Sequence, residues 1–122
     1  SITTPAKLDP TIKLSFSGQT CDGLGCGATN KDTCPVGTSC EYIQISSANW
    51  DAPTMKCIFS VGANAFGTET VATNASVVTG IAYGAPDQIT ADCSDSTTGE
   101  SATNSFTWHD VKEPPGPTPT TP

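Results

Sequence analysis

The chain has 122 residues, a net charge of −7, and five lysines with no arginine against twelve acidic residues. Nucleic-acid binding needs clustered cations that displace the counterions of phosphate, so these scattered lysines argue against a nucleic-acid partner. The chain also lacks an apolar run of 18 residues, which argues against membrane insertion.

Length and local composition predict one domain followed by a tail. We expect residues 1–110 to form a single domain, opened by an N-terminal arm over 1–10, and residues 111–122 to form a tail or linker. Five prolines in VKEPPGPTPTTP favour an extended polyproline conformation. Threonines among prolines are typical of O-glycosylated stalks, which predicts glycosylation at Thr118, Thr120 and Thr121.

Short segments with the alternation of a half-buried strand follow one another along the chain. The expected strands are 11–17, 40–46, 55–61, 68–73, 76–83, 88–93 and 102–108. Turns rich in Gly, Pro, Asn and Asp join them, and no segment has a helical period. The pattern predicts an all-β fold, a small disulfide-stapled antiparallel β-sandwich.

The closing stretch ITADCSDSTTGESATNSFTW, at 89–108, resembles the last hairpin of extracellular immunoglobulin-like modules. The resemblance is one of fold. It implies an architecture that is immunoglobulin-like in general plan.

The cysteines are six in number, with the spacing C-x4-C-x7-C-x5-C-x16-C-x35-C. They are Cys21, Cys26, Cys34, Cys40, Cys57 and Cys93. Zinc sites use CxxC-type pairs or cysteine mixed with histidine, and this spacing offers neither, so we expect no metal and no cofactor. Three disulfides in an oxidising compartment are expected instead, which predicts a secreted, extracellular or cell-surface protein.

Four of the cysteines lie in a glycine-rich loop expected over 18–40. That loop has almost no large apolar side chain, so crosslinks must hold it. Six cysteines allow 15 pairings, which the spacing leaves open. The exception is Cys57 and Cys93, each in a strand-like run, which we expect to pair between the two sheets.

No catalytic constellation is evident, and we expect no enzyme. The single histidine, His109, has Asp110 next to it. Adjacent strand residues point to opposite faces, so this carboxylate is badly placed to orient the imidazole. A solvated histidine is the simpler interpretation.

Aromatic side chains outside the expected core are the best indication of function. Trp50 lies in a predicted turn between Asn49 and Asp51, Tyr42 points away from its apolar neighbours, and Tyr83 ends a strand. Sugar rings have apolar C–H faces that stack on such rings, so these five residues form the predicted ligand-binding surface. The alternative for Trp50 is that it caps one end of the core. Trp108 is expected in the core.

Asn74 begins the sequon Asn-Ala-Ser in a predicted turn, which predicts N-glycosylation at Asn74.

Three functions fit these features. The first is a secreted non-catalytic binding module that recognises carbohydrate, such as a polysaccharide or cell-surface glycan, or other cell-wall material. The second is an extracellular structural or filament subunit, pilus-like, that binds copies of itself through strand edges or by donating the arm over 1–10. The third is a small secreted effector or inhibitor.

Overall fold

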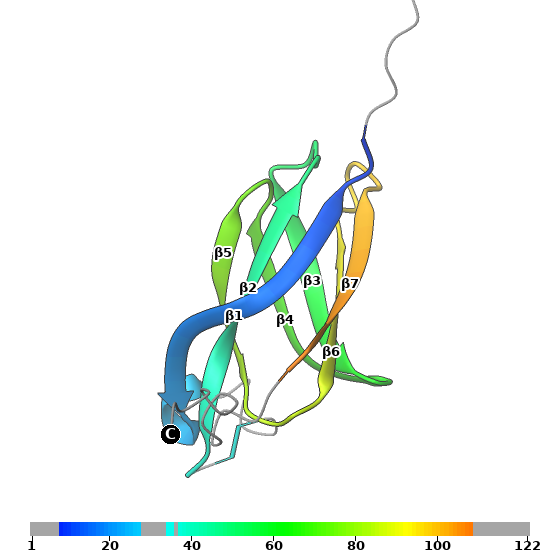
Figure 1. Ribbon diagram of the computed structural model, residues 1–122. Helices are drawn as coiled ribbons and strands as arrows, with labels where there is room; N and C mark the ends of the chain where they lie inside the picture. The colour runs from blue at the N-terminus through cyan, green and yellow to red at the C-terminus, as the bar shows by residue number, and fades with distance from the viewer. Residues whose placement is uncertain (1–7, 28–33, 36, 109–122) are drawn as a thin grey trace, which may run out of the picture.

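The computed structural model describes residues 8–27, 34, 35 and 37–108. Within these residues the chain forms seven β-strands and one short 3₁₀ turn, with no α-helix (Figure 1). The elements are β1 (Thr11–Asp22), η1 (Gly23–Cys26), β2 (Ser39–Ala48), β3 (Thr54–Val61), β4 (Asn64–Ala72), β5 (Ser76–Tyr83), β6 (Gln88–Ser94) and β7 (Ser101–Thr107). Most of the expected arm, all of the tail over 111–122 and its threonines Thr118, Thr120 and Thr121 lie outside the described residues.

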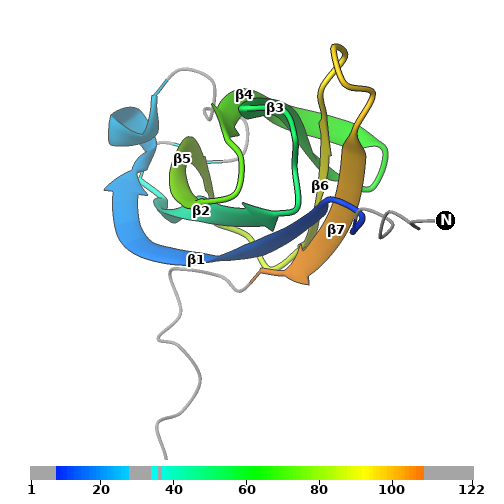
Figure 2. The ribbon, with the colours of Figure 1, turned by 90° about the horizontal axis from the view of Figure 1, so that it is seen from above.

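The strands form two antiparallel sheets, which confirms the all-β prediction. One sheet has the order β1-β2-β5 and the other β4-β3-β6-β7. Buried side chains of both sheets form one core between them. The view from above shows η1 on the outer side of the three-stranded sheet (Figure 2). In the described part of the chain, no helix is long and apolar enough to cross a membrane.

β1 is longer than the sequence predicted. Its pairing with β2 shifts register between Phe16 and Thr20 and then resumes as far as Asp22. Gly18 lies in this irregularity with a φ of 78°, a conformation that favours glycine, and its N–H donates to Glu41 Oε2 at 2.7 Å. The bulge returns the chain to the sheet, so Cys21 lies in a strand where a loop was expected.

The core draws alternate residues from both sheets. The central pair β3 and β6 contributes Met55, Phe59 and Ile89, which are fully buried. Cys57 and Cys93 are also directly opposite in this ladder and are bonded to each other, with Cα atoms 4.0 Å apart. The expected pairing is confirmed, but its placement between sheets is wrong, because β3 and β6 are neighbours in one sheet.

The two tryptophans close opposite ends of this core. Trp50 is 4% exposed, and its indole N–H donates to Thr11 O at 3.1 Å. Trp108 is 1% exposed, and its indole N–H donates to Tyr83 O at 3.0 Å, as expected for a core residue. Each indole therefore buries its apolar rings and satisfies a backbone carbonyl at the same time.

Polar side chains bridge the two seams where the sheets meet. At one seam, Asn104 of β7 donates its amide to Ile12 O of β1 at 2.8 Å. At the other, Glu69 of β4 accepts the N–H of Gly80 in β5 at 2.9 Å. Both bridges use a backbone group on a strand that ends its sheet, so they join the sheets and occupy part of the strand edge.

We predict that the core disulfide stabilises the fold more than a disulfide of the cysteine-rich segment. Replacing Cys57 and Cys93 by alanine removes a crosslink between residues 36 positions apart. Replacing Cys34 and Cys40 removes a crosslink between residues 6 positions apart. Chain entropy gives losses of about 4 and about 2 kcal/mol in the free energy of unfolding. The four side chains are similarly buried, so cavity terms are comparable. Guanidinium denaturation without reductant measures both, and equal losses would contradict the entropic account.

Candidate functional site

The structure separates the residues that the sequence grouped as a ligand-binding surface. Trp50 lies in the core, so its expected exposure in a turn is wrong and the alternative, that it caps one end of the core, is confirmed. Its backbone is held as well as its indole: Asn74 Oδ1 accepts the Trp50 N–H at 2.9 Å, and Asn74 Nδ2 donates to Trp50 O at 2.8 Å. These contacts draw the turn inward over the end of the sandwich.

Tyr83 is also buried, which corrects its expected exposure. It is 8% exposed, its ring packs on Phe66 with centroids 4.9 Å apart, and its hydroxyl donates to the Asp87 carboxylate. Burial, and then the hydrogen bond to Asp87 and its negative charge, raise the pKa of Tyr83 to about 12. The side chain therefore fixes the turn between β5 and β6.

Tyr42 keeps its predicted place on the outer face of the three-stranded sheet. It is half-buried, and its hydroxyl donates to Gly25 O at 3.4 Å. Asn49 and Asp51 are exposed as expected, but they lie beyond the other end of β2. Asn49 follows Tyr42 by seven positions along extended chain, or roughly 23 Å at about 3.3 Å per residue. The five residues therefore do not form one surface.

Acidic side chains near Asp51 serve the local backbone. The Glu100 carboxylate accepts the N–H groups of Asp51 and Ala52, the shortest contacts being 2.9 Å. Asp95 Oδ2 accepts the N–H of Thr98 at 2.9 Å within the turn between β6 and β7. These carboxylates stabilise turns at the end of the sandwich that Trp50 closes.

A second, smaller cluster of buried side chains lies on the outer face of the three-stranded sheet. We call it the disulfide lobe, formed by the described residues of 21–40. Two disulfides hold it, Cys21–Cys26 and Cys34–Cys40. The buried side chains of the cluster are Cys26, Cys34 and Cys40 of the lobe and Ala82 of β5, with Cys21 and Tyr42 packed against them. Crosslinks therefore hold this segment, as its composition predicted.

Close packing within the lobe depends on one glycine. A Cβ on Gly84 would lie 2.8 Å from Cys40 Sγ and 3.1 Å from Ser39 O. The distance to the bonded sulfur is shorter than real Cβ contacts and the distance to the backbone oxygen is tight, so glycine at this position lets the chain just after β5 approach the Cys34–Cys40 bond.

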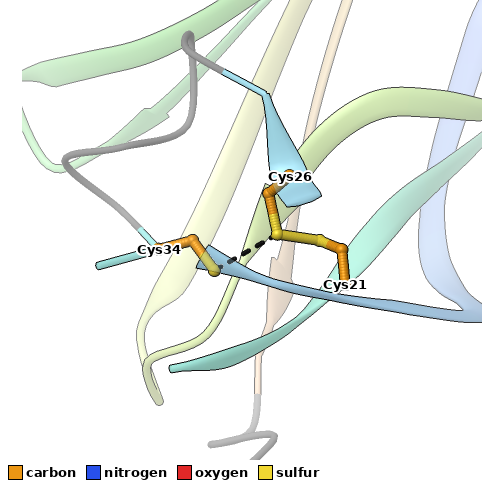
Figure 3. A group of neighbouring side chains, drawn as sticks. All are labelled: Cys21, Cys26 and Cys34. Carbon is orange, nitrogen blue, oxygen red and sulfur yellow. Dashed lines mark hydrogen bonds between the residues drawn. A yellow bond between two sulfur atoms is a disulfide. The ribbon is translucent and has the colours of Figure 1, made fainter. Parts of the chain in front are cut away.

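The two disulfides of the lobe are in contact with each other. Cys26 Sγ and Cys34 Sγ lie 3.4 Å apart, the contact dashed in Figure 3. The Sγ atoms of Cys21, Cys26 and Cys34 all lie within 4.8 Å of one another. Zinc binds cysteine as thiolate, so these sulfurs would become ligands only after both bonds were reduced.

The sequence offered no signal for the most exposed apolar side chain of the lobe. Leu24 lies in η1 and is 82% exposed, inside the loop closed by Cys21–Cys26. Asn74 was identified as a sequon, but its clamp on Trp50 was missed because it joins residues 24 positions apart. Glycosylation at Asn74 stays a prediction. A glycan would be attached to the same nitrogen that donates to Trp50 O.

Comparisons with family models, with curated proteins and with solved structures found no match to this chain.

We predict that the Asn74 side chain matters for stability in protein without glycans. Asn74→Ala removes two hydrogen bonds to Trp50 and leaves alanine at a φ of 56°, so we expect a loss of about 1–3 kcal/mol. Ser76→Ala destroys the same sequon but keeps the clamp; it removes only the exposed hydrogen bond from Gln44 and should change stability by about 0.5 kcal/mol or less. Chemical denaturation of bacterially expressed protein measures both. Equal losses would mean that the clamp is unimportant.

We predict that Tyr83 makes stability fall at alkaline pH. Its folded pKa of about 12 lies above the ordinary value of 10.0, so its contribution is complete below pH 10 and is lost as pH rises through 12. Because the hydroxyl lies near solvent, which screens the charge, the shift corresponds to roughly 1–2 kcal/mol. Rapid urea unfolding from pH 8 to 12 should show this loss in the wild type, and Tyr83→Phe should lack it. Parallel curves for the two proteins would refute the assignment.

Proposed function

We propose that this domain is a secreted, non-catalytic binding module, immunoglobulin-like in general architecture, that recognises carbohydrate on the outer face of its three-stranded sheet. The observation that carries the proposal is that this face presents Tyr42 together with amide and hydroxyl side chains that form hydrogen bonds, with Lys13 as a charged residue farther along the ladder. Ladder partners share a face, so Ser15 and Gln44 point outward together, as do Ser46 and Ser76.

The chemistry of this face suits a sugar. A tyrosine ring offers a flat apolar surface for the C–H groups of a pyranose. Amide and hydroxyl groups donate to and accept from sugar hydroxyls. Gln44 Nε2 already donates to Ser76 Oγ at 2.6 Å, which orients the amide across the sheet. Specificity in small-molecule sites comes from a few such polar groups beside apolar surface.

Compartment and architecture agree with an extracellular role. All six cysteines lie in the described residues and are paired, which fits an oxidising environment. The first, second and fifth strands share one sheet, and the third, sixth and seventh share the other. The immunoglobulin plan has the same distribution of these strands, and this supports the fold-level resemblance.

Assembly through strand edges is the weaker proposal. Asn104 and Glu69 each hold a backbone group on an edge strand, so a neighbour adding a strand there would have to displace them.

A second candidate, a small effector or inhibitor, has one observation in its favour. Leu24 is 82% exposed on a turn that a disulfide closes. A rigid apolar side chain of this kind can anchor a protein partner at low cost in conformational entropy.

We predict that Tyr42 is needed for glycan binding. Tyr42→Leu keeps the apolar contact with the lobe but removes the flat ring, and it should weaken binding about tenfold or more, or about 1.4 kcal/mol. The matched control is Ile58→Ala, which changes a residue 39% exposed on β3 of the other sheet and should bind as the wild type does. Retention on a panel of insoluble polysaccharides, followed by calorimetry, measures the effect.

Two results would overturn this proposal. One is a wild type that no polysaccharide retains, and the other is equal binding by Tyr42→Leu and wild type. If glycans fail and Leu24→Ser abolishes binding to a purified protein partner, the effector or inhibitor function takes its place.

A further inference from the structure

Four cysteines of the disulfide lobe form a closed ring of neighbours. Cys21 and Cys40 are opposite one another in the β1–β2 ladder. Each is bonded to a cysteine outside that ladder pair, Cys21 to Cys26 and Cys40 to Cys34. Cys26 and Cys34 touch in turn, with their Sγ atoms 3.4 Å apart (Figure 3). In the order Cys21, Cys26, Cys34, Cys40, disulfide bonds therefore alternate with pairs that are neighbours without a bond.

A second pairing uses the other two sides of this ring. Cys57 and Cys93 establish that this chain bonds cysteines directly opposite in an antiparallel ladder. Cys21 and Cys40 have that relation in the other sheet, so a bond between them requires no change of strand register. The two sulfurs left over, of Cys26 and Cys34, are already in contact. Both pairings are thus compatible with the same strands.

We propose that the lobe is a thiol-exchange site, at which a small external thiol converts the pairing Cys21–Cys26 with Cys34–Cys40 into Cys21–Cys40 with Cys26–Cys34. Cys21 is the point of entry, because it is half-buried while the other three are at most 3% exposed. Exchange of this kind needs a thiolate that can reach a disulfide sulfur. The inference concerns the sulfur chemistry of the lobe and does not depend on the proposed carbohydrate binding.

The conversion proceeds in three exchanges. The external thiolate attacks Cys21 Sγ, the Cys21–Cys26 bond breaks, and Cys26 leaves as a thiolate. Cys26 then attacks Cys34 Sγ across the 3.4 Å contact, forms Cys26–Cys34 and releases Cys40 as a thiolate. Cys40 attacks Cys21 Sγ in the mixed disulfide, forms Cys21–Cys40 and returns the external thiolate. Three S–S bonds form and three break, so the thiol is a catalyst and nothing is oxidised or reduced.

The exchange changes what the lobe presents. In the first pairing, Cys21–Cys26 closes the loop that carries η1 and the exposed Leu24. In the second, that loop is opened, and β1 is tied to β2 directly. The hydrogen bond from Tyr42 to Gly25 O links η1 to the outer face of the sheet. A change of pairing that moves η1 therefore also changes the contacts of Tyr42 on this face.

A tryptic map of the native protein tests the exchange. Cleavage after lysine places Cys21 and Cys26 in peptide 14–31, Cys34 and Cys40 in 32–56, and both remaining cysteines in 57–112. In the first pairing the peptides separate without reduction, and in the second 14–31 and 32–56 stay joined. Protein is incubated with glutathione at pH 8, quenched with acid and digested. We expect separate peptides to be lost and a joined species to appear, at unchanged intact mass.

The same map names the results that overturn the proposal. Absence of the joined species, with Cys57–Cys93 intact, excludes the second pairing. A joined species that fragmentation assigns to Cys21–Cys34 and Cys26–Cys40 excludes the proposed ring.

A single variant tests exchange across the contact between Cys26 and Cys34, with Cys34 instead of Cys26 as the attacking thiol. Cys40→Ser leaves Cys34 as a thiol in contact with Cys26. If Cys34 attacks, Cys26–Cys34 forms and the thiol moves to Cys21, where iodoacetamide reacts. Label on Cys21 supports the route, and label on Cys34 or on no lobe cysteine overturns it. In the control Cys93→Ser, the free Cys57 lies in the main core, so all four lobe cysteines should stay bonded and unlabelled.

Discussion

The disulfide between Cys57 and Cys93 is the constraint on which the rest of the sandwich depends. The loop that it closes contains β4 and β5. Each of these is an edge strand, β4 of the four-stranded sheet and β5 of the three-stranded sheet. The chain leaves the four-stranded sheet after β4, enters the three-stranded sheet at β5 and returns at β6. A bond between β3 and β6 restricts this whole excursion in the unfolded chain, while its sulfurs fill the centre of the core. Only 35% of the residues are apolar, so such a crosslink adds stability that burial alone supplies weakly.

Hydrogen bonds at the ends of the sandwich and between its sheets add to the stability that the small core provides. Each end is closed by a tryptophan whose indole satisfies a backbone carbonyl, and each seam is bridged by a polar side chain from an edge strand. These contacts use groups that would otherwise face water at the rim. A buried or half-buried polar group left without a partner costs free energy. These hydrogen bonds therefore favour one arrangement of the two sheets and also cover the ends of the core. The aromatic and amide side chains at the ends are consequently committed to the fold.

Local periodicity was sufficient to predict the seven strands, because alternation of buried and exposed residues is visible within each one. The same alternation also indicates that Tyr83 is buried, because Tyr83 lies on the same face of its strand as Ile81. The prediction that Tyr83 is exposed did not take this into account. Other features depend on strand order and could not be read locally. The placement of Cys57–Cys93 within one sheet requires β3 and β6 to be neighbours. The choice between the two interpretations of Trp50 depends on Asn74, which holds it from a distant turn. Tyr42 was placed correctly because the alternation with Ile43 and Ile45 fixes its face.

Because Trp50 and Tyr83 belong to the core, the proposed binding surface is reduced to the outer face of β1, β2 and β5, with the lobe beside it. Tyr42 belongs to both parts, since its ring packs against the lobe and its hydroxyl donates to Gly25 O. Thermodynamic linkage then joins the two proposals. If the pairing of the lobe cysteines changes the affinity of this face for a ligand, bound ligand must change the ratio of the two pairings by the same factor. The proposed exchange suits this coupling, because it rearranges bonds outside the main core while the Cys57–Cys93 disulfide keeps the sandwich intact.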